Sequence, residues 1–328
     1  MYPLLLASAL LAGFLLAVQA SVNQQLNRAV GTPFGASTLQ LLVAASALAV
    51  LAVATGAIGA VTLLPGVAWW LLLGGLASPL YITAGILLFP RLGALTAVGL
   101  FVTGQVFASL GLDLFGLLAV PQRSPGAGML LGAVAVLAGI TTIIRGRVLP
   151  GRASVSAVDG PGAASRTLLA DPPVRMAARG AWLVLGLVAG AVLPLQGAVN
   201  AQLRARIGAP LAVATVSFVV ATLAIAVVLV VLVALRRTPA PALAPLRRMP
   251  WWGWLGGLCA AAYVTATFLL LPTIGAAVTV ALTVTGQQLA SALVDQFGWF
   301  RMPRRPLTAA RGGGLVLLVV GSVLVQVG

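Results

Sequence analysis

Two apolar segments carry polar side chains at a spacing that places them on one face of a helix. The first segment has Gln105, Ser109 and Asp113, and the second has Thr283, Gln287, Ser291 and Asp295. Residues four positions apart share a helix face, so each set forms a polar stripe. The amides of Gln105 and Gln287 can donate and accept hydrogen bonds, which makes them candidate contacts for a substrate in a cavity. The same stripes could instead hold neighbouring helices together.

Two tyrosines are the next candidates. Tyr81 and Tyr263 lie deep within apolar segments, and each is followed two residues later by a threonine, Thr83 or Thr265. A tyrosine ring stacks on an apolar substrate while its hydroxyl forms a hydrogen bond. We therefore predict that these four residues contact substrate. The alternative is that the tyrosines are ordinary packed aromatic residues.

Amide side chains form two further pairs at helical spacing. Gln19 and Asn23 lie late in one apolar segment, and Gln196 and Asn200 lie late in another. These four residues are candidates for gating or lining the two ends of a cavity. They could also cap their helices and bind the loops that follow.

Asp113 and Asp295 are the two acids that lie outside residues 146–179, and the sequence has no glutamate. A carboxylate inside a membrane is costly and often marks an ion pathway, so both are candidates for ion coupling. Each also falls at the end of its apolar segment. A helix-end or loop contact, involving a nearby arginine, is the alternative.

The inventory of reactive residues excludes most enzyme classes. The chain has no histidine, no lysine, one cysteine and four acids. A Ser-His-Asp triad is impossible, and so are a lysine Schiff base and a phosphate-binding loop with its lysine. Too few ligands remain for a catalytic metal. We expect no enzyme activity, no cofactor and no metal.

Composition indicates where these residues lie. Of the 328 residues, 61% are hydrophobic and 7% are charged, whereas about a quarter of a soluble chain is charged. Most apolar runs are long enough to cross about 30 Å of hydrocarbon as a helix. They cover residues 3–22, 36–57, 67–88, 94–112, 127–144, 180–199, 211–234, 251–271, 276–294 and 312–327. We predict an all-α integral membrane protein with ten transmembrane helices.

An internal repeat divides the chain. VQASVNQQLNRAVGTP, beginning at Val18, matches LQGAVNAQLRARIGAP at an offset of 177 residues, and from the third apolar segment onward the offset is 182. We predict a five-helix repeat over 1–145, an Arg/Pro/Gly-rich linker over 146–179, and a second repeat over 180–328. Because five is odd, the second repeat would cross the membrane in the opposite sense. An inverted-topology repeat is a common plan of secondary transporters.

The arginines predict the orientation. With the N-terminus outside, all of them except Arg123, Arg204 and Arg206 fall in cytoplasmic loops or the linker. The positive-inside rule favours this arrangement. We therefore expect both termini outside and the linker in the cytoplasm. The formal charge of +15 is explained by this loop charge, so we expect no nucleic-acid partner.

The repeated motifs resemble those of a known family. The Q-x-x-x-N-x-x-L segments at 19–26 and 196–203, the WW-x-x-x-GG pairs, the Y-x-T segments and the TGQ segments followed by Ser and Asp carry the likeness. The sequence resembles the drug/metabolite transporter superfamily, in particular its DUF606 (YdcZ-like) branch. The resemblance implies two fused five-helix units and a ten-helix basket with a central cavity. It does not identify the cargo.

These observations predict a secondary transporter of the cytoplasmic membrane that moves a small organic metabolite or drug, outward, by alternating access. The expected partners are a small-molecule substrate and the lipid bilayer. A homo-oligomer is possible, although a two-repeat monomer suffices. The alternative is a non-transporting membrane module that organises or regulates a partner protein.

Overall fold

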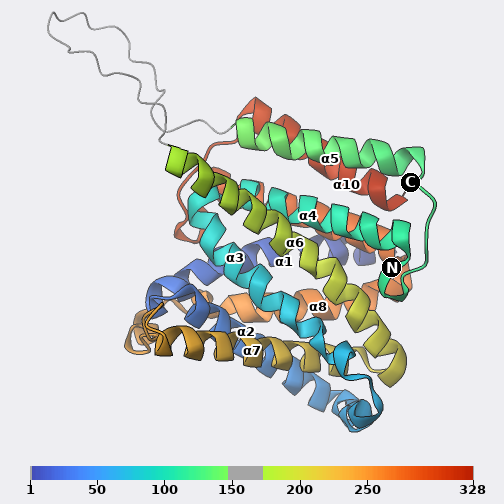
Figure 1. Ribbon diagram of the computed structural model, residues 1–328, viewed down its shortest axis with the longest axis vertical. Helices are drawn as coiled ribbons and strands as arrows, with labels where there is room; N and C mark the ends of the chain where they lie inside the picture. Colours follow the sequence, from blue (N-terminus) through green and yellow to red (C-terminus); the bar gives the residue numbers. More distant parts are fainter. Residues whose placement is uncertain (1, 147–172, 328) are drawn as a thin grey trace, which may run out of the picture.

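In the computed structural model, which describes residues 2–146 and 173–327, every regular element of the described chain is helical. Figure 1 shows the arrangement. The α-helices are α1 (Tyr2–Val30), α2 (Pro33–Ala54), α3 (Ala77–Leu92), α4 (Ala94–Phe115), α5 (Ala127–Arg145), α6 (Pro173–Ile207), α7 (Pro210–Ala234), α8 (Leu255–Ile274), α9 (Ala276–Phe297) and α10 (Ala309–Val327). Short 3-10 segments cover η1 (Ala57–Gly66), η2 (Trp69–Leu76), η3 (Leu117–Ala119), η4 (Ala244–Arg248), η5 (Trp251–Trp254) and η6 (Trp299–Arg301).

The α-helices have the length and the apolar sequences that membrane-spanning helices need. Within the described residues, eight helical segments are long and hydrophobic enough to cross a membrane. One of them joins η2 to α3, over Trp69–Leu92. The prediction of an all-helical membrane protein is thereby confirmed. The exact number of crossings stays a prediction.

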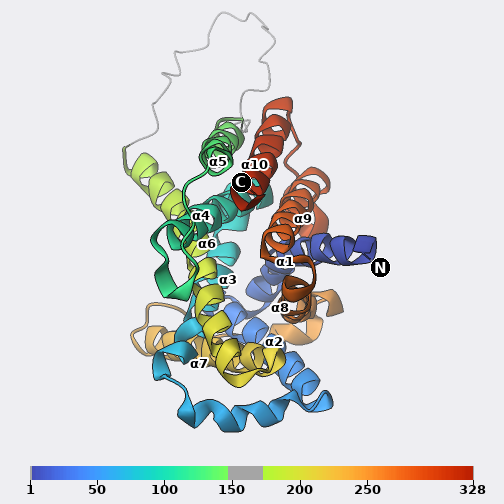
Figure 2. The same ribbon diagram turned by 90° about the vertical axis from the view of Figure 1, so that its right-hand side faces the viewer.

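Helices from the two ends of the sequence interleave. α1 packs against α8 and α9, and α6 packs against α3 and α4. α2 pairs with α7, and α5 pairs with α10. In both views the α5–α10 pair lies at one end of the molecule and the α2–α7 pair at the other (Figures 1 and 2). The central helices α1, α3, α4, α6, α8 and α9 lie between these pairs.

Glycines let the interleaved helices approach closely. A Cβ added at Gly13 of α1 would meet the backbone of Thr283, and one added at Gly190 of α6 would meet the backbone of Phe101. These contacts are equivalent in the repeat, because Gly13 corresponds to Gly190 and Phe101 to Thr283. In lipid, the hydrophobic effect does not drive helices together. Their association depends on close van der Waals packing, which small residues at the contact allow.

Two glycines separate consecutive helices by a conformation that other residues avoid. Gly93 has φ 81° and ψ 159° between α3 and α4, and Gly275 has φ 86° and ψ 156° between α8 and α9. This region of φ and ψ is essentially restricted to glycine. The chain therefore turns in the same way at both equivalent junctions.

The predicted linker lies mostly outside the described residues. α6 begins at Pro173, within the segment that the sequence assigned to the linker. The third apolar segment also differs in detail, because it starts as the 3-10 segment η2 before α3 begins at Ala77.

Candidate functional site

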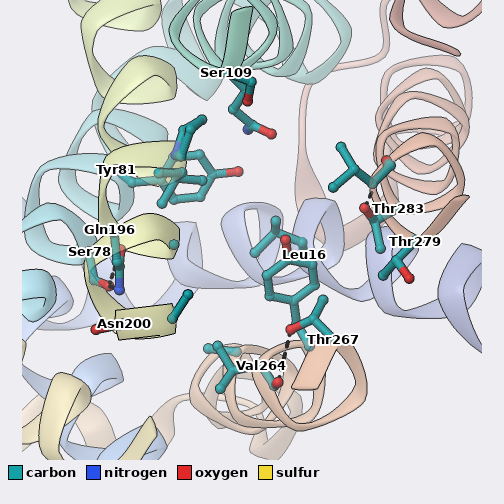
Figure 3. Close-up of a pocket in the computed structure, with 18 of the residues that line it drawn as sticks. Leu16, Ser78, Tyr81, Ser109, Gln196, Asn200, Val264, Thr267, Thr279 and Thr283 are labelled. Carbon is teal, nitrogen blue, oxygen red and sulfur yellow. Dashed lines mark hydrogen bonds between the residues drawn. The ribbon is translucent and has the colours of Figure 1, made fainter. Parts of the chain in front are cut away.

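A cavity of about 570 Å³ lies among the central helices. Residues of α1, α3 and α4 form one part of its wall, and residues of α6, α8 and α9 form most of the rest. Phe218 of α7 and Gln326 of α10 also line it. Figure 3 shows how side chains from these helices surround the space. Most of the lining is apolar; the polar side chains are Gln19, Ser78, Tyr81, Gln105, Ser109, Gln196, Asn200, Arg204, Tyr263, Thr267, Thr279, Thr283 and Gln326.

Tyr81 and Tyr263 both line the cavity, as expected from their depth in the sequence. Tyr81 is 5% exposed, and its ring packs on Phe101 with the centroids 4.8 Å apart. Its hydroxyl points into the open space (Figure 3). Among the described residues, no side chain or backbone group forms a hydrogen bond with either phenol. Both hydroxyls are therefore free to bind a substrate.

Two amides complete this set of unpartnered groups. Gln105 lines the cavity from α4, and Gln19 lines it from α1. The Nε2 of Gln105 and the Oε1 of Gln19 are buried without a hydrogen-bond partner in the described chain. Buried polar atoms in proteins nearly always have a partner. Both amides belong to the wall of one cavity, so a rotation of each side chain would turn these buried atoms toward a polar ligand.

A hydrogen-bond network covers the wall where α3, α6 and α7 meet. The Oγ of Ser78 donates to the Oε1 of Gln196 at 3.1 Å, and the Nε2 of Gln196 lies 2.9 Å from the same hydroxyl. Asn200 donates to the Oγ of Ser217 at 3.2 Å. Gln196 and Asn200 thus line the cavity, and these hydrogen bonds join them to the neighbouring helices α3 and α7 rather than to the loop that follows α6.

Their counterparts in α1 differ. Gln19 lines the cavity, but Asn23 does not. Asn23 is 1% exposed and donates to the Oε1 of Gln40 in α2 at 3.2 Å. The structure therefore places Asn23 in a helix–helix contact.

Three other predicted residues also lie away from the cavity. Thr83 is buried with its hydroxyl 2.9 Å from that of Ser37. Thr265 lines a separate apolar hollow between α2 and α8. Gln287 is 1% exposed, and its Oε1 has no partner among the described residues.

The two aspartates lie outside the cavity lining. Asp295 is 2% exposed and accepts hydrogen bonds from the backbone N–H of Ala94 at 2.8 Å and of Leu95 at 3.2 Å. Arg311 also donates to it at 2.6 Å in a buried ion pair. This carboxylate thus binds the first turn of α4. Asp113 is partly exposed at the end of α4.

Several lining residues were not predicted. Thr267 lies in an apolar helix without a stripe that marks it. Ser78 lies three positions before Tyr81, and Thr279 lies four positions before Thr283, so each shares a helix face with a predicted residue. Arg204 is the only charged residue in the lining. It was assigned to a loop, whereas α6 extends to Ile207.

The cavity opens at the C-terminal end of α6. Ala201, Ala205 and Gly208 line it there and are exposed. The opposite end is covered by contacts between distant segments. Arg28 donates to the carbonyl of Arg301 at 3.2 Å, and Arg305 donates to that of Pro90 at 2.8 Å.

Comparisons with known proteins agree with this architecture. A family model described as "Putative inner membrane exporter, YdcZ" matches residues 4–142 and 181–324. One solved structure, described only as "Crystal structure of protein", is similar with a TM-score of 0.53 and 17% sequence identity. That similarity covers 97% of this chain and 96% of the other, and it concerns the fold alone. A comparison with curated proteins found no match.

Proposed function

The chain belongs to the family described as "Putative inner membrane exporter, YdcZ", and from this premise we propose that it is a secondary transporter. It exports a small organic metabolite or drug across the cytoplasmic membrane by alternating access. The observation that carries the proposal is the central cavity of about 570 Å³, which is lined by Tyr81 and Tyr263 with hydroxyls that have no partner among the described residues.

Equivalent contacts in the two halves support a 5+5 inverted repeat of ten crossings. Asn23 donates to Gln40, and its counterpart Asn200 donates to Ser217, the counterpart of Gln40. Gln25 donates to the carbonyl of Phe300, and the counterpart of this contact joins Gln202 to Leu118 at 2.7 Å. Two units that share a contact pattern and enclose one site are the arrangement that alternating access requires.

In the proposed orientation the termini are outside and the linker is cytoplasmic. The mouth of the cavity at Arg204 and Gly208 then faces outward, and the closed end near Arg301 and Arg311 faces the cytoplasm. The structure would therefore correspond to an outward-open state. The arginine-rich closed end is the one that the positive-inside rule assigns to the cytoplasm.

The lining favours a neutral or zwitterionic cargo of moderate polarity. Apolar surface dominates the wall, and Arg204 supplies its only charge. The phenols of Tyr81 and Tyr263 and the amide of Gln105 offer hydrogen bonds. A polyanion would find only one cation here, and a cation would find no carboxylate.

Ligand-dependent thermal stability of the purified full-length protein, followed by flux in proteoliposomes, tests this function. A metabolite and drug panel is measured first. A ligand at 100 times its Kd stabilises the native state by about 2.7 kcal/mol. Gly197 lines the cavity, and an added Cβ there meets nothing within 4 Å. The variant Gly197→Trp should fill the cavity without disturbing the helices.

The matched control is Thr265→Trp, which places the same side chain in the separate hollow between α2 and α8. We expect Gly197→Trp to abolish both the ligand shift and the flux, and Thr265→Trp to preserve them. If ligands stabilise the Gly197→Trp variant as much as the unchanged protein, this cavity is excluded as the binding site. Binding without flux would favour a non-transporting membrane module.

A further inference from the structure

One end of the molecule is held shut by contacts between the two halves. Asp295, at the end of α9, binds the first N–H groups of α4. Arg305 donates to the carbonyl of Pro90, just before α4, at 2.8 Å. On the same side Arg28 of α1 donates to the carbonyl of Arg301 at 3.2 Å. We call the contact between Asp295 and the start of α4 the closed-end latch.

The other end contains the same parts in an unlatched arrangement. Asp113 is the counterpart of Asp295, and Gly275 is the counterpart of Gly93. The two glycines have nearly identical φ and ψ. A Cβ at Gly93 would meet Asp295 and Arg305, whereas one at Gly275 would meet nothing within 4 Å. Asp113 itself is partly exposed, whereas Asp295 is buried.

Buried amides in α9 give an independent indication. Gln287 and Gln288 are the counterparts of Gln105 and Val106, which both line the cavity. Gln288 is 0% exposed, and neither its Nε2 nor its Oε1 has a partner among the described residues. Burying such groups without hydrogen bonds is costly. They would regain partners, from water or substrate, if this part of α9 faced an open cavity.

We infer that the chain has a second state in which the latch changes ends. Asp113 then binds the N–H groups of Ala276 and Ala277, as Asp295 binds those of Ala94 and Leu95 here. The mouth beside α6 closes and the opposite end opens. Gln287 and Gln288 become lining residues of the cavity. This inference rests on the proposed transport function and names the gate and the cavity wall of the state that transport requires.

The two latches are not identical. Asp295 is paired with Arg311, whereas the counterpart of Arg311 is Met129. An ion pair thus reinforces only the closed-end latch. This difference favours the state seen here. It also supplies a matched variant, Asp295→Ala with Arg311→Met, which weakens that latch without leaving a buried arginine unpaired.

Cysteine labelling of the full-length protein tests whether the latch changes ends. In a Cys259→Ser background, Gln288→Cys and Gln105→Cys report on the two parts of the wall. The labelling rate with N-ethylmaleimide is measured in membrane vesicles. Gln105 is partly exposed, whereas Gln288 is 0% exposed, so we expect rapid labelling at position 105 and slow labelling at position 288. Adding Asp113→Ala should lower the rate at position 288 about fivefold, the effect of losing one helix cap, without slowing labelling at position 105.

The double variant Asp295→Ala/Arg311→Met should have the reverse effect and raise the rate at position 288. The inference is overturned if Asp113→Ala leaves the rate at 288 unchanged or raises it, or if position 288 stays unlabelled in the double variant. Gel filtration of each variant checks that it is folded. The ligand and flux measurements with Gly197→Trp are independent of these rates, so the transport function can hold although the latch fails.

Discussion

Gln105 and Gln287 occupy equivalent positions in the two halves of the chain, yet only Gln105 lines the cavity. Gln105 is partly exposed to the open space, whereas Gln287 is 1% exposed with a carbonyl oxygen that lacks a partner. The two residues have the same local sequence, TGQ. Their environments differ because the cavity is open at only one end.

This difference predicts opposite effects of the same substitution. Gln105→Leu removes a polar amide from the cavity wall and should weaken ligand binding about tenfold, the value of one hydrogen bond. Gln287→Leu removes an unpartnered buried amide and should raise the melting temperature. Thermal unfolding with and without ligand measures both effects. Equal losses of affinity in the two variants would contradict the observed asymmetry.

Tyr81→Phe should separate binding from stability. The hydroxyl has no partner among the described residues, while the ring packs on Phe101. The variant keeps the ring contact, so the melting temperature without ligand should stay within about 1 °C, and ligand affinity should fall about tenfold. Titration calorimetry measures the affinity. Phe101→Ala serves as the contrast, because loss of a core ring should cost about 3–5 kcal/mol of stability.

Arg311→Ala should destabilise the protein more than the paired replacement. Arg311 and Asp295 are 5% and 2% exposed, so the single variant leaves a buried carboxylate without its cation. Breaking a buried pair in this way costs about 3–5 kcal/mol, whereas replacing both partners by apolar residues is often neutral. Chemical unfolding of Arg311→Ala and of Asp295→Ala/Arg311→Met compares the two. A larger loss in the double variant would refute this account.

Glycine packing between α5 and α10 gives a fourth prediction. A Cβ at Gly132 would lie 2.7 Å from the carbonyl oxygen of Gly321, whereas one at Gly111 of α4 would meet nothing within 4 Å. Alanine is the better helix former by about 1 kcal/mol. Gly111→Ala should therefore raise the melting temperature, and Gly132→Ala should lower it because the helices must separate. A gain of stability in Gly132→Ala would show that α5 and α10 can move apart at little cost in free energy.

Much of the candidate site could be predicted from the sequence. Tyr81, Tyr263 and Gln105 line the cavity, as their depth and spacing indicated, and so do Gln19, Gln196 and Asn200. Thr83 and Asn23 do not, because each finds a partner on α2 instead, namely Ser37 and Gln40. A helix that is apolar on all sides does not reveal which face meets a cavity. Thr267 in α8 was missed for that reason.

The sequence by itself determined the helical membrane class, the repeat and the family, because length, hydropathy and internal matches are local or linear properties. Only the tertiary structure decided which of two equivalent residues lines the cavity, and which of two equivalent aspartates binds the start of a helix. Asp295 binds the N–H of Ala94, which lies 201 positions away in the chain, while its counterpart Asp113 is partly exposed at the end of α4. Two nearly equal sequences take different roles because the fold opens one end of the cavity and closes the other.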